Sequence, residues 1–67
     1  MKISARNVLK GKITDIKKGA TTAHVLIDVN GTTITASITN ESVDDLALKV
    51  GDSVSAIIKS SDVIIGK

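Results

Sequence analysis

The Asn30-Gly31 pair, flanked by two segments of alternating apolar and polar residues, constrains the fold of this chain most. Both residues tolerate the positive φ angles of a type I′ turn, which joins adjacent antiparallel strands. Residues 22–29 precede the pair and residues 33–39 follow it, and every second residue in both segments is apolar. The sequence therefore predicts a β-hairpin centred on Asn30-Gly31.

Further segments with the two-residue period are predicted to be strands. Residues 8–16 alternate in this way around Gly11, which indicates a bulge or a close approach of another backbone. Residues 53–58 repeat the pattern. After the polar interruption Lys59-Ser60-Ser61, the apolar residues 63–65 are predicted to form a last short strand.

The period changes after residue 39, where a short helix is expected over residues 40–47. Thr39 or Asn40 can cap its first turn, and acidic residues follow at positions that suit the helix dipole. Val43 and Leu46 are spaced so that both would turn inward. This helix separates the third predicted strand from the fourth.

Two polar segments are predicted to be turns, Lys17-Lys18-Gly19-Ala20 and Val50-Gly51-Asp52. Five strands and one short helix after the third strand describe an all-β fold, a small five-stranded OB-like barrel. The length of 67 residues leaves room for one domain, over residues 1–67.

Composition predicts that this barrel assembles into an oligomer. The chain has no cysteine and no aromatic residue, yet 42% of its residues are hydrophobic and its mean hydropathy is +0.24. So small a domain is marginal alone, and association would bury the excess apolar surface. Leu26 and Ile57 are expected on outward faces as subunit contacts. A single histidine, His24, predicts no metal-cation site, and no apolar run is long enough for a membrane span or a signal peptide, so a cytoplasmic location is expected.

Two clusters of hydrogen-bond donors stand out as a candidate binding site. Ser4, Arg6 and Asn7 form the first cluster, and Arg6 is the one arginine of the chain. Lys59, Ser60 and Ser61 form the second. Arginine presents a planar fork of donors suited to oxyanions, and the hydroxyl and amide groups add donors without charge. We therefore hypothesise that the clusters converge on a small dianion; the alternative is that the first cluster is a solvated lead-in to the first strand.

Three segments of the sequence resemble the molbindins, also called Mop proteins, which bind molybdate and tungstate. The opening Ile3-Ser4-Ala5-Arg6-Asn7, continued by Leu9-Lys10-Gly11, is similar to their first motif. Residues 38–43 are similar to their strand-to-helix segment and residues 56–63 to their closing one. The resemblance covers essentially the whole chain.

The resemblance implies a homohexamer, a trimer of dimers, that stores molybdate or tungstate at sites between subunits and serves molybdenum homeostasis. It implies that Ser4, Arg6, Lys59 and Ser60 line one site, with Asn7 and Ser61 close by. A second site, on a threefold axis and built on backbone amides, is expected near Lys18, Gly19 and Ala20. The oxyanion would be the only ligand, with no organic cofactor.

Other functions remain to be weighed against oxyanion binding. An OB-fold protein that binds single-stranded nucleic acid is the main alternative, but such grooves stack bases on aromatic residues, which this chain lacks. A purely structural subunit is a second alternative. An enzyme is not expected, because the chain has no cysteine, no supported Ser-His-Asp arrangement and no glycine-rich phosphate loop.

Overall fold

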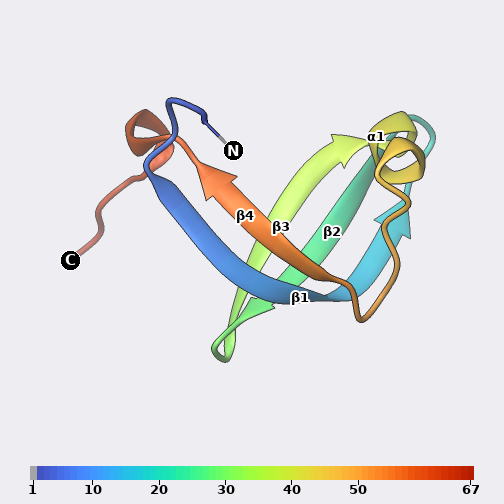
Figure 1. The fold of residues 1–67 in the computed structure, drawn as a ribbon, viewed down its shortest axis with the longest axis horizontal. Coiled ribbons are helices and arrows are strands. Elements are labelled where there is room, and N and C mark those ends of the chain that lie inside the picture. The colour runs from blue at the N-terminus through green and yellow to red at the C-terminus, as the bar shows by residue number, and fades with distance from the viewer. Residues whose placement is uncertain (1) are drawn as a thin grey trace.

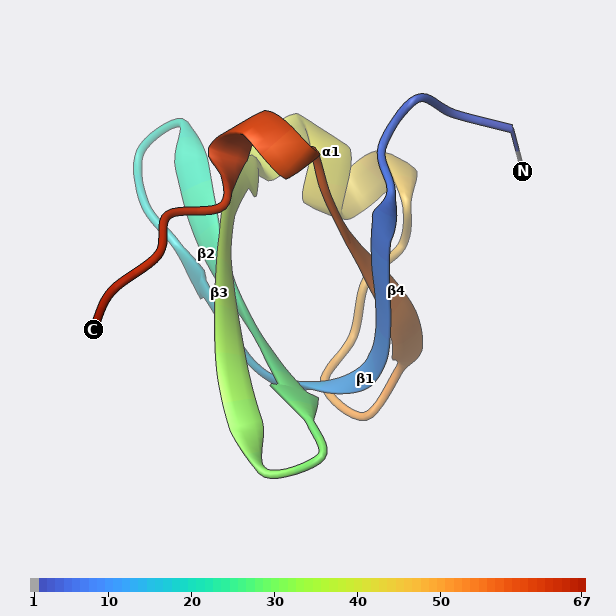
Figure 2. The same ribbon diagram turned by 90° about the vertical axis from the view of Figure 1, so that its left-hand side faces the viewer.

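The computed structural model describes residues 2–67, and one antiparallel sheet dominates this part of the chain (Figure 1). The sheet contains four strands in the order β3-β2-β1-β4. The elements are β1 (Asn7–Lys18), β2 (Thr22–Val29), β3 (Thr32–Thr39), α1 (Asn40–Asp45), β4 (Ser53–Ile58) and a single 3₁₀ turn, η1 (Ser60–Asp62). Figure 2 shows that the sheet curls strongly, so that β3 and β4 face each other across its concave side. The structure thus agrees with a small, mostly β fold that has one short α-helix after the third strand.

The predicted hairpin is confirmed. Asn30 and Gly31 have φ angles of 51° and 88°, the left-handed values that a type I′ turn needs. The N–H of Gly31 donates to the carboxylate of Asp28 over 3.1 Å, which fixes the turn further. From this turn β2 and β3 pair without interruption along their whole length.

Strand β1 is the longest strand and pairs with both β2 and β4. Its register with β2 shifts between Ile13 and Asp15, so the bulge lies there and not at Gly11. Gly11 instead allows the close approach that was also considered, because a Cβ at this position would lie 2.3 Å from the carbonyl oxygen of Asp28. The prediction that Lys17 and Lys18 belong to a turn was wrong, since β1 extends through both residues by pairing with β2.

Helix α1 begins where the sequence indicated and ends earlier than expected. Thr39 is the cap, and its hydroxyl oxygen accepts a hydrogen bond of 3.0 Å from the N–H of Ser42. Val43 is buried, as predicted. Leu46 was predicted to turn inward but is 67% exposed, because the helix stops before it and the left-handed Ala47, with a φ of 50°, redirects the chain.

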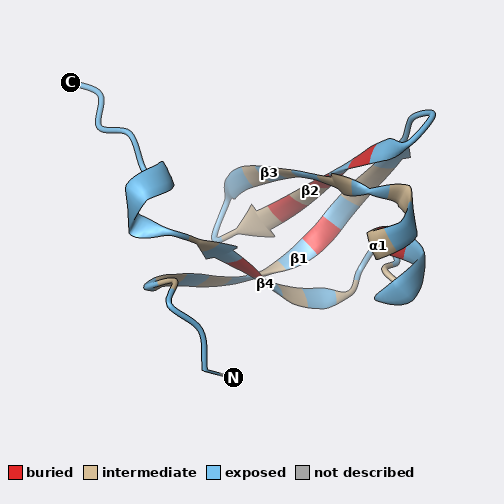
Figure 3. Ribbon diagram, turned by 90° about the horizontal axis from the view of Figure 1, so that it is seen from above, coloured by how far each residue is buried: buried red, intermediate tan, exposed pale blue. Residues whose placement is uncertain are grey.

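The core lies on the concave side of the sheet and contains only aliphatic side chains. Its buried members are Ile13, Ala23, Val25, Ile27, Val43 and Ala56. Figure 3 shows these buried positions along the middle of β1, β2 and β4 and on α1. Their spacing follows the two-residue period, which places every second side chain of a strand on the same face. Of the two outward apolar residues, Ile57 is exposed and Leu26 is half-buried.

The predicted fifth strand is absent from the described residues, so the five-stranded barrel is not completed within one chain. After β4 the chain makes η1, and residues 63–67 have no regular secondary structure. A three-residue apolar run satisfies the pattern of a strand, but a strand also needs an edge with which to pair, and among the described residues no strand pairs with this run. No helix among residues 2–67 is long and apolar enough to cross a membrane.

Candidate oxyanion site

The two predicted donor clusters adjoin the same end of the sheet. The first residue of β1, Asn7, pairs with the last residue of β4, Ile58. The side-chain amide of Asn7 also donates to the carbonyl of Ile58 over 3.1 Å, a contact that joins positions 51 residues apart. Residues 4–6 and 59–61 therefore leave this strand pair at one end, as Figure 1 shows.

The two cations of these clusters have no acidic partner within the described chain. The ion pairs among residues 2–67 are Lys17 with Asp15 at 3.8 Å and Lys18 with Asp44 at 2.7 Å. Arg6 and Lys59 belong to neither pair, and both side chains are exposed. Their positive charges are thus available to a ligand, which is the state that an anion site requires.

One chain does not enclose a binding pocket around these donors. Figures 2 and 3 show that the segment before β1 and the turn η1 leave the strand ends on opposite sides. Ser4, Ser60 and Ser61 are exposed like the two cations. Three depressions on the described surface measure about 560, 440 and 260 Å³, and none of them includes a residue of either cluster. The clusters adjoin one end of the sheet, outside these three depressions.

Asp62 follows the second donor cluster directly and lies in a turn. In a strand, Asp62 would point to the face opposite Ser61. Residues 60–62 form a 3₁₀ turn instead, in which the N–H of Asp62 donates to the carbonyl of Lys59 over 2.9 Å. The alternation of a strand does not apply to such a turn. Asp62 is consequently an exposed carboxylate in the same turn as the second cluster.

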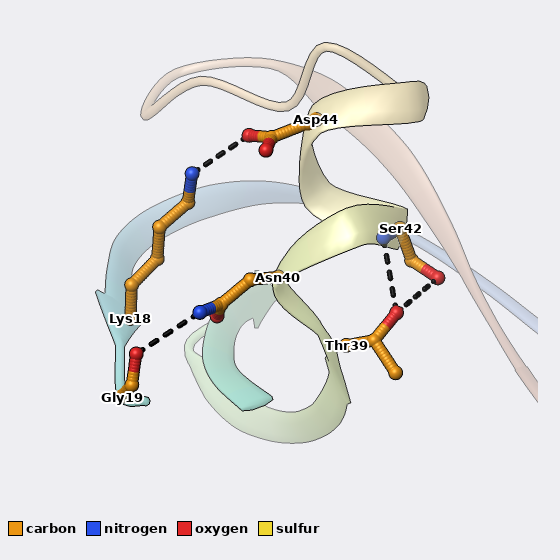
Figure 4. Close-up of polar contacts among 6 residues, drawn as sticks. All are labelled: Lys18, Gly19, Thr39, Asn40, Ser42 and Asp44. Carbon is orange, nitrogen blue, oxygen red and sulfur yellow. Dashed lines mark hydrogen bonds and ion pairs between the residues drawn. The ribbon is translucent and has the colours of Figure 1, made fainter. Parts of the chain in front are cut away.

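The second predicted site lies at the opposite end of β1, where Figure 4 shows its contacts. The ammonium of Lys18 pairs with Asp44, and both side chains are partly exposed. The N–H of Gly19 donates to the carbonyl of Thr22 over 2.7 Å, and the carbonyl of Gly19 accepts from the side-chain amide of Asn40 over 2.9 Å. Within one chain, the charge of Lys18 and the amide of Gly19 are therefore already engaged.

A depression of about 260 Å³ beside this segment includes three residues that were not predicted to belong to a site, Lys17, Thr22 and His24. It is lined by Lys17, Lys18, Gly19, Thr22 and His24, while Ala20 lies outside it in the exposed bend that follows. Lys17 and His24 are directly opposite each other in the β1–β2 register. Extending the first strand by two residues would have predicted this pairing, because cross-strand neighbours share a face.

Comparisons with known proteins show the family of the chain and agree with its fold. The TOBE domain model matches residues 3–65. Molybdenum-pterin-binding protein 3 of Clostridium pasteurianum is 47% identical over 66 residues, which cover 97% of each chain. The solved structure of a molybdate-binding protein from Sporomusa ovata is 42% identical, covers 100% of both chains and superposes with a TM-score of 0.96.

A further solved structure is that of the cytoplasmic molybdate-binding protein ModG with molybdate bound. It is 46% identical with a TM-score of 0.91, and the match covers 96% of this chain but 46% of ModG. These relatives are named for the binding of molybdate or molybdenum-pterin and not for a catalysed reaction. The chain therefore belongs to the TOBE-domain family and, within it, to the molybdenum-pterin-binding (Mop) proteins, the family that its opening and closing motifs resemble.

Proposed function

We propose that this chain binds molybdate or tungstate at sites between the subunits of a homohexamer, and that it stores these oxyanions in the cytoplasm. Residues 1–67 would act as one domain. The observation that carries the proposal is the pairing of Asn7 with Ile58, which brings the unpaired cations Arg6 and Lys59 to one end of the sheet. The names of the relatives support the ligand, and the description of ModG as cytoplasmic supports the location.

The donors at this end suit a tetrahedral dianion that only accepts hydrogen bonds. Arg6 and Lys59 supply charge-assisted donors, and the hydroxyls of Ser4 and Ser60 supply neutral ones. We assign Asn7 a structural role, because its side-chain amide already donates a hydrogen bond to the carbonyl of Ile58. It fixes the start of β1 to the end of β4 and so sets the positions from which the donors extend.

The open geometry supports a site between subunits. The two donor clusters leave the sheet end on opposite sides, so a second copy would close the site around an anion. An enclosed site also excludes water, which strengthens hydrogen bonds to a charged ligand. The exposed apolar residues Ile57, Ile64 and Ile65 supply surface for such assembly. The hexameric arrangement itself is supported by the resemblance to molbindins.

Lys18, Gly19 and Ala20 are proposed as a second oxyanion site, formed where several copies meet. Binding there would compete with the Lys18–Asp44 ion pair, because the ammonium cannot serve both partners fully. Breaking this ion pair costs little stability, because the pair is partly exposed and exposed ion pairs contribute about 0–1 kcal/mol.

Calorimetric titration with sodium molybdate tests the main site. Arg6→Ala and Lys59→Ala should each lower the affinity at least about tenfold, because a hydrogen bond to a charged group contributes about 1.5–3 kcal/mol. Lys10→Ala is the matched control, since it removes an exposed lysine of β1 that belongs to neither cluster. Asp62→Asn should leave the affinity unchanged or raise it, because it removes a negative charge beside the second cluster. Light scattering verifies that each variant keeps the wild-type assembly; unchanged affinity in both cation variants would place the site elsewhere.

The proposal takes the free oxyanion, without an organic cofactor, as the ligand, so inorganic molybdate alone should saturate the sites. The alternative of single-stranded nucleic-acid binding has little support, because the chain has no aromatic residue on which bases could stack. We expect a labelled oligonucleotide at moderate salt not to be retained in a filter assay.

A further inference from the structure

Strands β1 and β4, which run side by side in Figure 1, present lysine and serine in pairs on their outer face. Lys10 lies directly opposite Ser55, and Lys12 lies directly opposite Ser53. Because successive side chains of a strand alternate between its two faces, these four residues lie on the side away from the core. All four are exposed, and they line a depression of about 440 Å³ between the strands. Together they form the lysine-serine face.

The two ammonium groups of this face have no acidic partner within residues 2–67. Lys10 and Lys12 belong to neither ion pair of the described chain. Asp28 lies opposite Lys12 across the β1–β2 pairing, but its carboxylate accepts a hydrogen bond inside the β2–β3 turn. Asp52, just before β4, accepts one of 2.9 Å inside its own turn. The face therefore offers two positive charges and two hydroxyls to an acceptor from outside the chain.

The spacing of the two pairs matches the carboxylates of an extended acidic segment. Residues that face each other on antiparallel strands have Cβ atoms about 4.5–5.5 Å apart, so the ammonium and the hydroxyl of one pair can donate to the two oxygens of one carboxylate. The second pair lies two residues further along β1, which is about 6.8 Å. Alternate side chains of another extended chain have the same separation. A segment with an acid at every second residue would place one carboxylate on each pair.

The shape and composition of the face favour a protein segment over other anions. A small-molecule site encloses most of its ligand, whereas all four side chains here are exposed. A single-stranded nucleic acid stacks its bases on aromatic residues, and the chain has none. Anionic membranes attract clusters of about four to eight basic residues, and the basic residues of this face are Lys10 and Lys12 alone.

We propose that the lysine-serine face is a docking surface for an extended segment of a partner protein in which acidic residues alternate with other residues. The segment lies along β1 and β4, with one carboxylate on Lys10 and Ser55 and the next on Lys12 and Ser53. The contact at Lys12 is the weaker one, because Asp28 partly offsets its charge. The face shares no residue with either donor cluster, so docking does not depend on the proposed function and the two can fail separately.

Nuclear magnetic resonance titration with two synthetic peptides of identical composition tests the docking. In the first peptide glutamate and threonine alternate; in the second, pairs of glutamates alternate with pairs of threonines, so that no two glutamates are two residues apart. The amide signals of residues 10–12 and 53–55 should shift with the first peptide. It should bind at least about threefold more tightly than the second, because it alone seats a carboxylate on each pair. Molybdate should not displace it, and displacement would place the peptide in the donor clusters and overturn the proposal.

Removing the two charges should weaken the binding of the alternating peptide. Lys10→Gln/Lys12→Gln is expected to lower its affinity at least about fivefold, because two exposed ion pairs are lost. Lys49→Gln/Lys67→Gln is the matched control, since it removes the same charge from exposed lysines outside the depression, and it should change the affinity less than about twofold. Equal losses in the two variants would reduce the effect to net charge and overturn the proposal.

Removing the two hydroxyls tests the paired geometry at constant charge. Ser53→Ala/Ser55→Ala should lower the affinity at least about twofold, because each carboxylate loses one donor. Unchanged affinity in this variant, or equal affinity of the wild type for the two peptides, would overturn the proposal. So would tighter binding of a labelled oligonucleotide or of anionic lipid vesicles that depends on Lys10 and Lys12, because another partner would then occupy the face. Light scattering follows each variant: if Lys10→Gln/Lys12→Gln loses the wild-type assembly, the face is a contact between copies and docking is refuted.

Discussion

Replacing Gly11 by alanine should destabilise the fold more than any other glycine-to-alanine change in the chain. The added Cβ would lie 2.3 Å from the carbonyl oxygen of Asp28 and 2.8 and 2.9 Å from methyl groups of Ile27 and Val29. Ordinary contacts begin near 3.4 Å, so β1 and β2 would have to separate by about 1 Å at this point. The methyl groups can rotate away, but the carbonyl belongs to the backbone of β2 and cannot.

The magnitude follows from two opposing contributions. Overpacking of this kind costs typically about 1–3 kcal/mol, and a clash with backbone belongs at the upper end. Alanine also restricts the unfolded chain more than glycine does, which offsets about 0.4–1 kcal/mol of this cost. We therefore expect Gly11→Ala to lower the free energy of unfolding by about 2–2.5 kcal/mol. A chain of this length has a total of about 3–10 kcal/mol, so the loss is a large fraction of it.

Urea unfolding followed by far-ultraviolet circular dichroism measures this loss, since the chain has no aromatic residue to provide fluorescence. Gly66→Ala is the matched control, because a Cβ there would meet nothing within 4 Å. Both variants and the wild type are compared at one protein concentration, since association adds to the apparent stability. A Gly11→Ala protein within about 0.5 kcal/mol of the wild type would refute the argument from the close approach, because overpacking costs more than that.

Three further predictions concern the helix cap, the second site and ligand selectivity. Thr39→Ala should lower the free energy of unfolding by about 1 kcal/mol in the same urea assay, because Ser42 loses its hydrogen-bond acceptor; Thr33→Ala, on an exposed position of β3, should not. Lys18→Ala should lower the free energy of unfolding by less than about 1 kcal/mol, because it removes an exposed ion pair. In calorimetry the same variant should bind fewer molybdate ions per assembly, with unchanged affinity at the first site. Phosphate should displace molybdate better at about pH 8.5 than at about pH 6, because phosphate loses its second proton over this range, and the protonated form offers a donor where only acceptors are accommodated. Sulfate competition should stay constant over that range, and equal competition by phosphate throughout would contradict a donor-only site.

Local chemistry explains which parts of the fold could be predicted from the sequence. Asn30-Gly31 determines its turn because the two residues themselves provide the unusual φ angles. Gly11 indicated close packing because a missing side chain in an alternating strand leaves space for another backbone. Thr39 was one of two candidate caps, with Asn40, because a threonine hydroxyl can accept from an N–H three residues later, as it does from Ser42. In each case the cause and the effect lie within a few residues or on one strand.

The parts that were predicted incorrectly depend on contacts distant in sequence. Lys17 and Lys18 have the composition of a turn, but pairing with β2 holds both in β1. Leu46 matches the helical spacing of Val43, yet the helix ends before it. Residues 63–65 match a strand, but no edge in their own chain accepts them.

In the candidate site, too, local features could be predicted and features that depend on distant contacts could not. Residue chemistry identified both donor clusters, and the β1–β4 register places them at one end of the sheet. The sequence could not indicate that the clusters leave that end on opposite sides, because the directions depend on η1 and on the curl of the sheet. The same holds for Asp62, which lies beside the second cluster because residues 60–62 form a 3₁₀ turn.

The pairing of Asn7 with Ile58 also determines when, during folding, a ligand could first be bound. The β2–β3 hairpin closes a loop of two residues, whereas the β1–β4 pairing joins positions 51 residues apart and closes the largest loop of the sheet. Closing a longer loop costs more entropy, so contacts of this separation tend to form late. Arg6 and Lys59 would then reach the same end of the sheet only once the rest of the sheet is in place. A bound anion would accordingly slow unfolding and leave the folding rate nearly unchanged, so the protein would hold its ligand by kinetic stability and not by faster assembly of the chain.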